Sequence, residues 1–277
     1  MSRNLETKLK ISGDSTSAQA ALRSTEEGLG RVEKQAKKTG LSQITMTTMA
    51  GLTSGKNYDV VAYDDSGTAK LDLLPAWTSN TARANAIERK NGYWVNSAAA
   101  TTVLNGFSLA QYKGLVLGTL RTTGTTTTED SQAKRFVDVI YNQVPRLGLH
   151  AEATASWTYT TSAWRQQNNS SANRIEWVDS LPGKVSQLKN SAITATSSGS
   201  DTVRYVGIGI DSTAGDPISA SMFSANNVSV YGVAQADVPV GVGYHYAAAM
   251  EWSGAAGTTT WYAGNASKVF ISRVAAG

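Results

Sequence analysis

The stretch from Tyr58 to Leu73, YDVVAYDDSGTAKLDL, decides the fold class of this chain. Its first six residues are mostly branched or aromatic, which favours a β-strand. The following DDSG at 64–67 has the composition of a tight turn, and after it apolar residues alternate with Lys70 and Asp72. Alternation with a period of two is typical of a half-buried strand. The stretch therefore predicts a β-hairpin.

The same pattern continues on both sides of this hairpin. Asn91-Gly92, between 86–90 and 93–95, has the composition of a two-residue type I′ turn and predicts a second hairpin. Further strands are expected at 115–121, 149–160, 174–178, 203–210, 228–233, 243–252, 258–263 and 268–274. The segment 133–141 fits both a helical face and a strand, and we expect a strand. Many short strands predict a β-sandwich or jelly roll for residues 41–277, with a subdivision near 100–146 left open.

Residues 1–40 have a different character. Alternating residues at 5–11 predict a short strand, and TSAQ at 16–19 has the form of a helix capping box. The apolar spacing after it is that of a coiled-coil seam, with Leu22, Thr25, Leu29, Val32 and Ala36 as its members. Gly28 and Gly30 each weaken a helix by about 1 kcal/mol, so this helix is expected to need partners. We therefore expect an attachment or oligomerisation element, a trimeric coiled coil; the alternative is a solvated, frayed leader.

Composition removes several classes of protein. The 277 residues include no cysteine, which excludes disulfide frameworks, cysteine nucleophiles and thiolate metal sites. The two histidines, His150 and His245, lie far apart in sequence and do not have metal-ligand spacing. No metal and no cofactor are therefore expected.

The charge distribution does not favour nucleic acid. The net charge is +4, but residues 1–40 hold eight Lys and Arg against five Asp and Glu, and the remaining residues are nearly balanced. A nucleic-acid groove needs clustered basic residues interleaved with aromatics, and residues 41–277 contain no such run. The sequence also lacks a secretory signal and a run of about 18 apolar residues. We expect the protein to be made in the cytoplasm and not to insert into a membrane.

Residues 1–40 resemble the N-terminus of phage tail tape-measure proteins, which pair such a strand with a helix. A helix rises about 1.5 Å per residue, so forty residues span at most about 60 Å. That length is far too short for a ruler of a phage tail. The resemblance therefore implies a shared attachment element and not a tape measure.

A second resemblance covers about residues 55–180. Its residues, which we call the fibre motif, are Trp77-Thr78, Arg83, Asn91-Gly92, 117–123 (LGTLRTT), Glu129-Asp130-Ser131, Arg135-Phe136-Val137 and Tyr141-Asn142. They recur in this order in phage fibre and tail-associated proteins, although Val116 and Asp138 replace the usual aromatic residues. The resemblance implies a virion component, homotrimeric, with β-rich domains that project from tail or head.

The charged residues of the fibre motif have two interpretations. Arg121 and Arg135 flank Glu129 and Asp130 across a Thr-rich loop, so charge-assisted hydrogen bonds are expected to fasten the loop. The alternative is that they are ordinary solvated charges. Adjacent carboxylates on a strand point to opposite faces, which argues against a glycosidase pair. No Gly-x-Ser-x-Gly elbow occurs either, and we expect no enzymatic activity.

Aromatic residues cluster with amides and arginine between residues 157 and 177. Such a mixture can stack on sugar rings while the polar groups orient the sugar. The candidate glycan contacts are Trp157, Tyr159, Trp164, Arg165, Asn168 and Trp177. The alternative is that these tryptophans are core residues. Trp252 and Trp261, which flank a small-residue turn, are expected to be packing residues.

Together these observations predict a structural protein of a tailed-phage virion. We expect a tail-fibre or projection subunit that attaches to the host surface, with other virion proteins and host surface glycan as partners. The first alternative is a capsid decoration or head-fibre protein, and the second is a depolymerase of host polysaccharide. The expected location is the virion.

Overall fold

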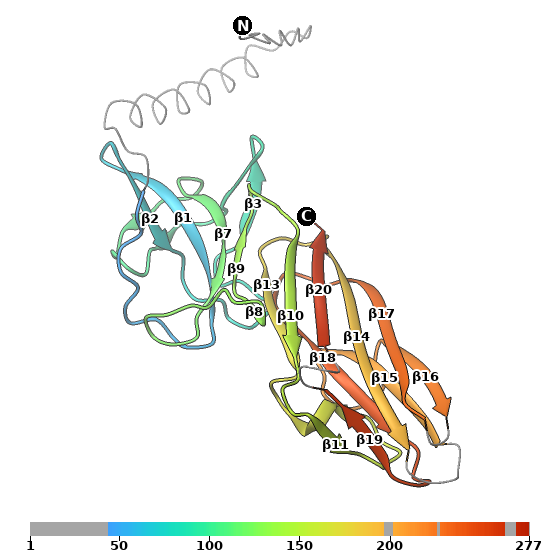
Figure 1. Ribbon diagram of the computed structural model, residues 1–277. Coiled ribbons are helices and arrows are strands. Elements are labelled where there is room, and N and C mark those ends of the chain that lie inside the picture. Colours follow the sequence, from blue (N-terminus) through green and yellow to red (C-terminus); the bar gives the residue numbers. More distant parts are fainter. Residues whose placement is uncertain (1–43, 197–201, 226–227, 264–269, 277) are drawn as a thin grey trace, which may run out of the picture. The chain divides into compact units, whose positions relative to one another are not determined.

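The computed structural model describes residues 44–196, 202–225, 228–263 and 270–276, and these are organised mainly in β-strands (Figure 1). Their one helical element is the short 3-10 helix η1 (Gln167–Asn169). The expected mainly-β fold class is confirmed. The predicted strand, helix and oligomer seam of residues 1–40 lie outside the described residues. No helix within the described ranges is long and apolar enough to cross a membrane.

The first sheet contains residues 117–121 of the fibre motif, on β7, and Val137, on β9. Its main path has the order β2-β1-β7-β4-β3, and β9 also pairs with β7. The strands are β1 (Asn57–Asp65), β2 (Thr68–Leu73), β3 (Ile87–Lys90), β4 (Tyr93–Asn96), β7 (Leu115–Arg121) and β9 (Val137–Val139). β5 (Ala100–Thr101) and β6 (Ser108–Leu109) form a separate two-stranded sheet.

Both predicted hairpins form, and their turns explain why. Ser66 and Gly67 have φ of 53° and 90°, and Asn91 and Gly92 have φ of 50° and 86°. Positive φ at both loop residues is the signature of a type I′ turn, whose twist matches that of the flanking strands. The tip of the first hairpin, Asp64–Lys70, does not belong to the compact unit formed by Met46–Tyr63 and Leu71–Gly277.

The remaining strands form a second and a third sheet. The second has the order β10-β20-β14-β19-β11, with β17 also paired to β14; the third has the order β16-β15-β18-β13-β8, with β12 also paired to β18. The second sheet comprises β10 (Arg146–Ala151), β11 (Ser156–Thr158), β14 (Val185–Thr196), β17 (Val230–Pro239), β19 (Thr259–Tyr262) and β20 (Phe270–Ala276). The third comprises β8 (Lys134–Arg135), β12 (Arg165–Gln166), β13 (Arg174–Asp179), β15 (Thr202–Ile210), β16 (Ser219–Ala225) and β18 (Gly243–Ser253).

The second and third sheets pack face to face around one apolar core. Leu188 and Trp261 of the second sheet share this core with Trp177 and Ile208 of the third, and all four are at most 3% exposed. Alternate residues of each strand point inward, as the two-residue period requires. This arrangement is a β-sandwich, the architecture expected from the sequence.

Three strands of the sandwich, β12, β14 and β16, were not expected from the sequence. β14 lies centrally, between β17 on one side and β20 and β19 on the other (Figure 1). Its sequence, VSQLKNSAITAT, places Asn190 at an inward position where an apolar residue is usual. Asn190 is tolerated because its amide donates to the carbonyl oxygen of Gly207 at 2.7 Å. The ambiguous segment 133–141 forms β8 and β9, so the strand prediction is confirmed.

Candidate functional site

Three residues of the fibre motif meet at one buried carboxylate, that of Asp59 on β1. The Trp77 indole donates to Oδ2 at 3.0 Å and the Thr119 hydroxyl donates to Oδ1 at 2.6 Å. Arg83 donates to both carboxylate oxygens, from Nε at 2.8 Å and from Nη2 at 3.0 Å, and its guanidinium lies 4.2 Å from the centre of the Trp77 ring. Asp59 is 1% exposed. This cluster, which we call the Asp59 network, gives the motif a structural role.

Gly118 of the fibre motif is required by a close approach of two strands. A Cβ atom at this position would lie 2.1 Å from the carbonyl oxygen of Asp138 on the paired strand β9. We expect Gly118→Ala to destabilise the protein by about 1–3 kcal/mol, because backbone atoms must move apart. Urea unfolding measures this. Gly241→Ala is the control, since nothing lies within 4 Å of its Cβ position; equal stability of the two variants would contradict the explanation.

The hydrogen bonds of Arg121 go to neighbouring strands and loops and not to Glu129 or Asp130. Its Nη1 donates to Asn57 Oδ1 at 3.0 Å and to Asn80 Oδ1 at 3.1 Å. Its guanidinium lies 3.7 Å from the centre of the Tyr244 ring. Burial lowers the pKa of Arg121. The arginine thus joins β7 to residues far away in sequence.

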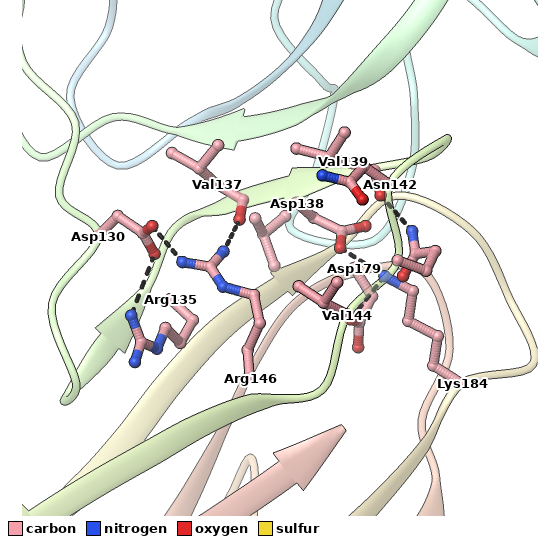
Figure 2. Close-up of a pocket in the computed structure, with 12 residues that line it drawn as sticks. Asp130, Arg135, Val137, Asp138, Val139, Asn142, Val144, Arg146, Asp179 and Lys184 are labelled. Carbon is pink, nitrogen blue, oxygen red and sulfur yellow. Dashed lines mark hydrogen bonds and ion pairs between the residues drawn. The ribbon is translucent and has the colours of Figure 1, made fainter. Parts of the chain in front are cut away.

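The other charged residues of the motif do form ion pairs, as one of the two interpretations expected. Glu129 accepts from Lys134 at 3.0 Å, and Asp130 pairs with Arg135 and Arg146. Figure 2 shows Arg146 also reaching the carbonyl oxygen of Val137. These contacts fasten residues 129–137 to the start of β10.

A pocket lies beside these ion pairs (Figure 2), and its volume is about 250 Å³. Lys184 pairs there with Asp138 and, at 3.7 Å, with Asp179. Apolar Val139 and Val144 also line the pocket and are 43% and 54% exposed. The charges in the pocket thus compensate one another, and nothing in its lining selects a particular ligand.

A second buried carboxylate, Glu251 on β18, organises most of the predicted glycan contacts. The Trp157 indole and Arg165 Nε donate to it at 2.7 Å each, and the backbone N–H of Asn168 donates at 3.1 Å. Glu251 is 0% exposed. Burial raises its pKa to about 7, against the lowering effect of these three donors. We call Glu251 with these donors the Glu251 network.

Glu152 lies next to this network and has the opposite electrostatic character. Burial alone would raise its pKa, but hydrogen bonds from the Thr154 N–H, Asn173 and Asn168 outweigh burial and lower the pKa to about 2. The Asn168 amide donates to Glu152 while its backbone N–H donates to Glu251. Asn168 has a positive φ of 55°, a conformation that asparagine tolerates. One residue therefore links the two carboxylates.

Carboxylates with divergent pKa values often mark an acid and a base. Here Glu251 is 0% exposed and its oxygens accept from Trp157, Arg165 and Asn168. A proton donor must come within hydrogen-bonding distance of its substrate, and this carboxyl has no exposed surface that a substrate can reach. The arrangement instead ties the segments that carry Trp157, Arg165 and Asn168 to β18.

The six candidate glycan contacts fall into three groups: the residues around Glu251, Trp164 next to Tyr205, and the buried Trp177. Trp157, Arg165 and Asn168 belong to the Glu251 network, and Tyr159 lies under the Arg165 guanidinium at 3.8 Å. Trp164 packs against Tyr205 instead, with ring centres 5.9 Å apart.

Trp177 does not lie on a surface, so its assignment as a glycan contact is corrected. It is 0% exposed in the sandwich core and donates to Asp179 at 2.9 Å. Its inward position on β13 places it among the residues of the other sheet, which is the core alternative stated above.

Sequence reasoning missed Glu251, Glu152 and Tyr205. A usable signal existed for Glu251, since it interrupts the apolar run AAAM at 247–250 just before Trp252. Glu152 and Tyr205 carry no such signal. Within the described ranges, no three His, Asp or Glu residues are grouped so as to hold a metal ion.

Comparison with known proteins does not identify a relative. No protein-family model and no curated protein matches the chain. Among solved structures, the chain is similar at 10% identity and a TM-score of 0.30 to dimeric latent PorU from Porphyromonas gingivalis, covering 89% of this chain and 26% of that one. It is similar at 12% identity and a TM-score of 0.23 to an isomalto-dextranase from Arthrobacter globiformis T6 complexed with panose, covering 78% and 36%. It is similar at 8% identity and a TM-score of 0.24 to the Cry4Aa toxin from Bacillus thuringiensis, covering 85% and 54%.

Proposed function

We propose that this protein is a structural component of a tailed-phage virion, a tail-fibre or projection subunit that contacts the host surface. The observation that carries the proposal is the Asp59 network. Trp77, Arg83 and Thr119, the residues that resemble those of phage fibre proteins, converge there on one buried carboxylate. A motif used to hold a β domain together is consistent with a scaffold role.

The aromatic residues near the end of the sandwich support the attachment part of the proposal. Tyr159, Trp164 and Arg165 are only partly buried, and exposed aromatic faces beside polar groups suit contact with sugars. Assembly as a homotrimer through the seam at 22–36, with other virion proteins as neighbours, belongs to the same proposal.

Antibody labelling of intact phage particles tests the location. An antibody against residues 41–277 is expected to label fibres or the tail tip in electron micrographs. Label over the capsid would favour the alternative of a decoration or head-fibre protein. Absence of label on every particle would contradict the proposal that the protein is part of the virion.

The depolymerase alternative has its own assay. Purified protein is expected to leave host surface polysaccharide intact, as measured by the release of reducing ends over time. Cleavage that is lost in Glu152→Gln would instead establish an enzyme and would make Glu152 its first candidate base.

A further inference from the structure

At one end of the third sheet the usual distribution of polar and apolar side chains is reversed. Residues of β15 and β18 that share the inward face with Val206 and Ala249 include Arg204, Glu251 and Ser253. All three of these polar residues are 0% exposed. Successive side chains of a strand point to opposite faces, so Tyr205 and Trp252, which adjoin these polar residues in sequence, point outward.

The outward residues form what we call the outer aromatic row, Trp164, Tyr205 and Trp252. Tyr205 and Trp252 are direct cross-strand partners, with ring centres 5.1 Å apart and ring planes at 84°. Trp164 reaches the row from the segment just before β12 and lies 5.9 Å from Tyr205 at 58°. Each of the three side chains keeps part of its surface accessible.

The backbone beneath the row is shaped to hold Trp164. A Cβ atom on Gly207 would lie 3.0 Å from the Trp164 ring and 2.8 Å from the Pro217 ring. Trp164 and Pro217 therefore both rest directly on the β15 backbone beside Tyr205. The ring is held in place by a residue with no side chain, so its position is set before any partner arrives.

The outward position of these aromatic side chains indicates that the outer aromatic row contacts a partner molecule and is not needed for the folding of the chain. Turning large aromatic side chains toward water forgoes the burial that stabilises a core. The adjacent inward positions hold Arg204 and Glu251, and Glu251 accepts hydrogen bonds from Trp157, Arg165 and Asn168.

The composition of the row and its rim indicates the chemistry of the partner. The row holds three aromatic rings and no charged side chain. Exposed Thr161, whose carbonyl oxygen accepts from the Ser253 N–H, borders it on one side, and exposed Asp216 precedes Pro217. Rings that present an apolar face, bordered by hydroxyl and carboxylate oxygens, match a sugar ring, which has an apolar C–H face and hydroxyl donors at its edge.

We propose that the outer aromatic row binds neutral hexose or N-acetylhexosamine units of a host surface polysaccharide. This inference rests on the proposed role in host attachment and gives it a site. The site consists of Trp164, Tyr205 and Trp252. Trp157 is left out because its indole N–H is committed to Glu251, and Trp177 because it is buried.

Binding of the full chain to an array of immobilised glucose, galactose and N-acetylglucosamine oligomers tests the site. The wild-type protein is expected to bind at least one of these oligomers, confirmed in solution by titration of tryptophan fluorescence. Trp252→Ala and Tyr205→Ala are each expected to weaken that binding about tenfold or more, as loss of a central aromatic contact does. Trp252→Phe is expected to retain most of it.

The control is Tyr231→Ala, which removes a tyrosine that is 54% exposed on β17 of the other sheet. Unchanged thermal melting of each variant shows that it folds. Failure of the wild-type protein to bind any oligomer, or undiminished binding by the folded variants, would overturn the inference. A native mass that drops in Trp252→Ala would also overturn it, because the row would then be a contact between copies of the chain.

Failure of this inference can be told apart from failure of the proposed function. Label on fibres without oligomer binding would leave the virion role standing and remove the sugar site. Oligomer binding that depends on the row, with no label on particles, would keep the site and remove the virion role.

Discussion

Replacing Asp59 with alanine is expected to lower the free energy of unfolding by about 3–5 kcal/mol. The side chain of Arg83 is only 12% exposed, and it would lose its carboxylate partner while remaining in place. Removing one member of a buried ion pair has an effect of this size because the other charge is left uncompensated. Trp77 and Thr119 would lose their acceptor as well. Urea unfolding followed by circular dichroism measures the change.

Asp65→Ala is the matched control, because Asp65 lies on the same strand and also pairs with a cation. Its partner Lys70 is 2.5 Å away, but the side chains of Lys70 and Asp65 are 43% and 29% exposed. Solvent-exposed ion pairs add little to stability, so this variant is expected to unfold close to the wild type. Similar unfolding midpoints for Asp59→Ala and Asp65→Ala would contradict the structural role of the Asp59 network.

The second large effect is a dependence of stability on pH that comes from Glu251. Burial raises its folded pKa to about 7, above the ordinary value of 4.5. Between these two pH values the folded state binds a proton that the unfolded state has released, so stability falls as pH rises and is level above about pH 7. The fall expected from this one group is about 3 kcal/mol. Urea unfolding at several pH values between 4.5 and 8 measures it.

Glu251→Gln is expected to remove most of this slope, because glutamine keeps the shape and cannot ionise. His245 contributes to the remainder. Burial alone would lower its pKa, but the hydrogen bond and charge of Asp211, 2.8 Å away, raise it above 6.5. Its contribution is therefore present at low pH and is lost as pH rises through that raised pKa. An unchanged slope in Glu251→Gln, with the slope gone in His245→Gln, would assign the effect to the histidine.

The local signals in this sequence predicted the hairpins well. The turn at Asn91-Gly92 and the alternation after Gly67 depend on neighbouring residues, and both hairpins form where they were expected. The strands β7, β13, β15 and β18 also follow from alternation and β-branched content. A strand can be predicted from a period of two because successive side chains point to opposite faces of the sheet, so buried apolar residues alternate with exposed polar ones.

Strands whose pattern depends on distant partners were not predictable in this way. β14 is the central strand of its sheet, yet Asn190 breaks its apolar face. The acceptor of that amide lies on β15 of the opposite sheet. Neighbouring residues in the sequence do not indicate such a hydrogen bond, so β14 could not be predicted although it is central in its sheet.

The sequence alone was sufficient for the fold class, the hairpins and the gathering of aromatic residues near 157–177, since composition, turn chemistry and periodicity are properties of neighbouring residues. Tertiary structure was needed to show which of those aromatics are buried, which bind Glu251 and which form a row with Tyr205 and Trp252. Trp157 and Glu251 are 94 positions apart, and Asp59 and Thr119 are 60 apart. A buried carboxylate is stable only where the fold brings its donors to it, and that meeting is a property of the whole sandwich or sheet.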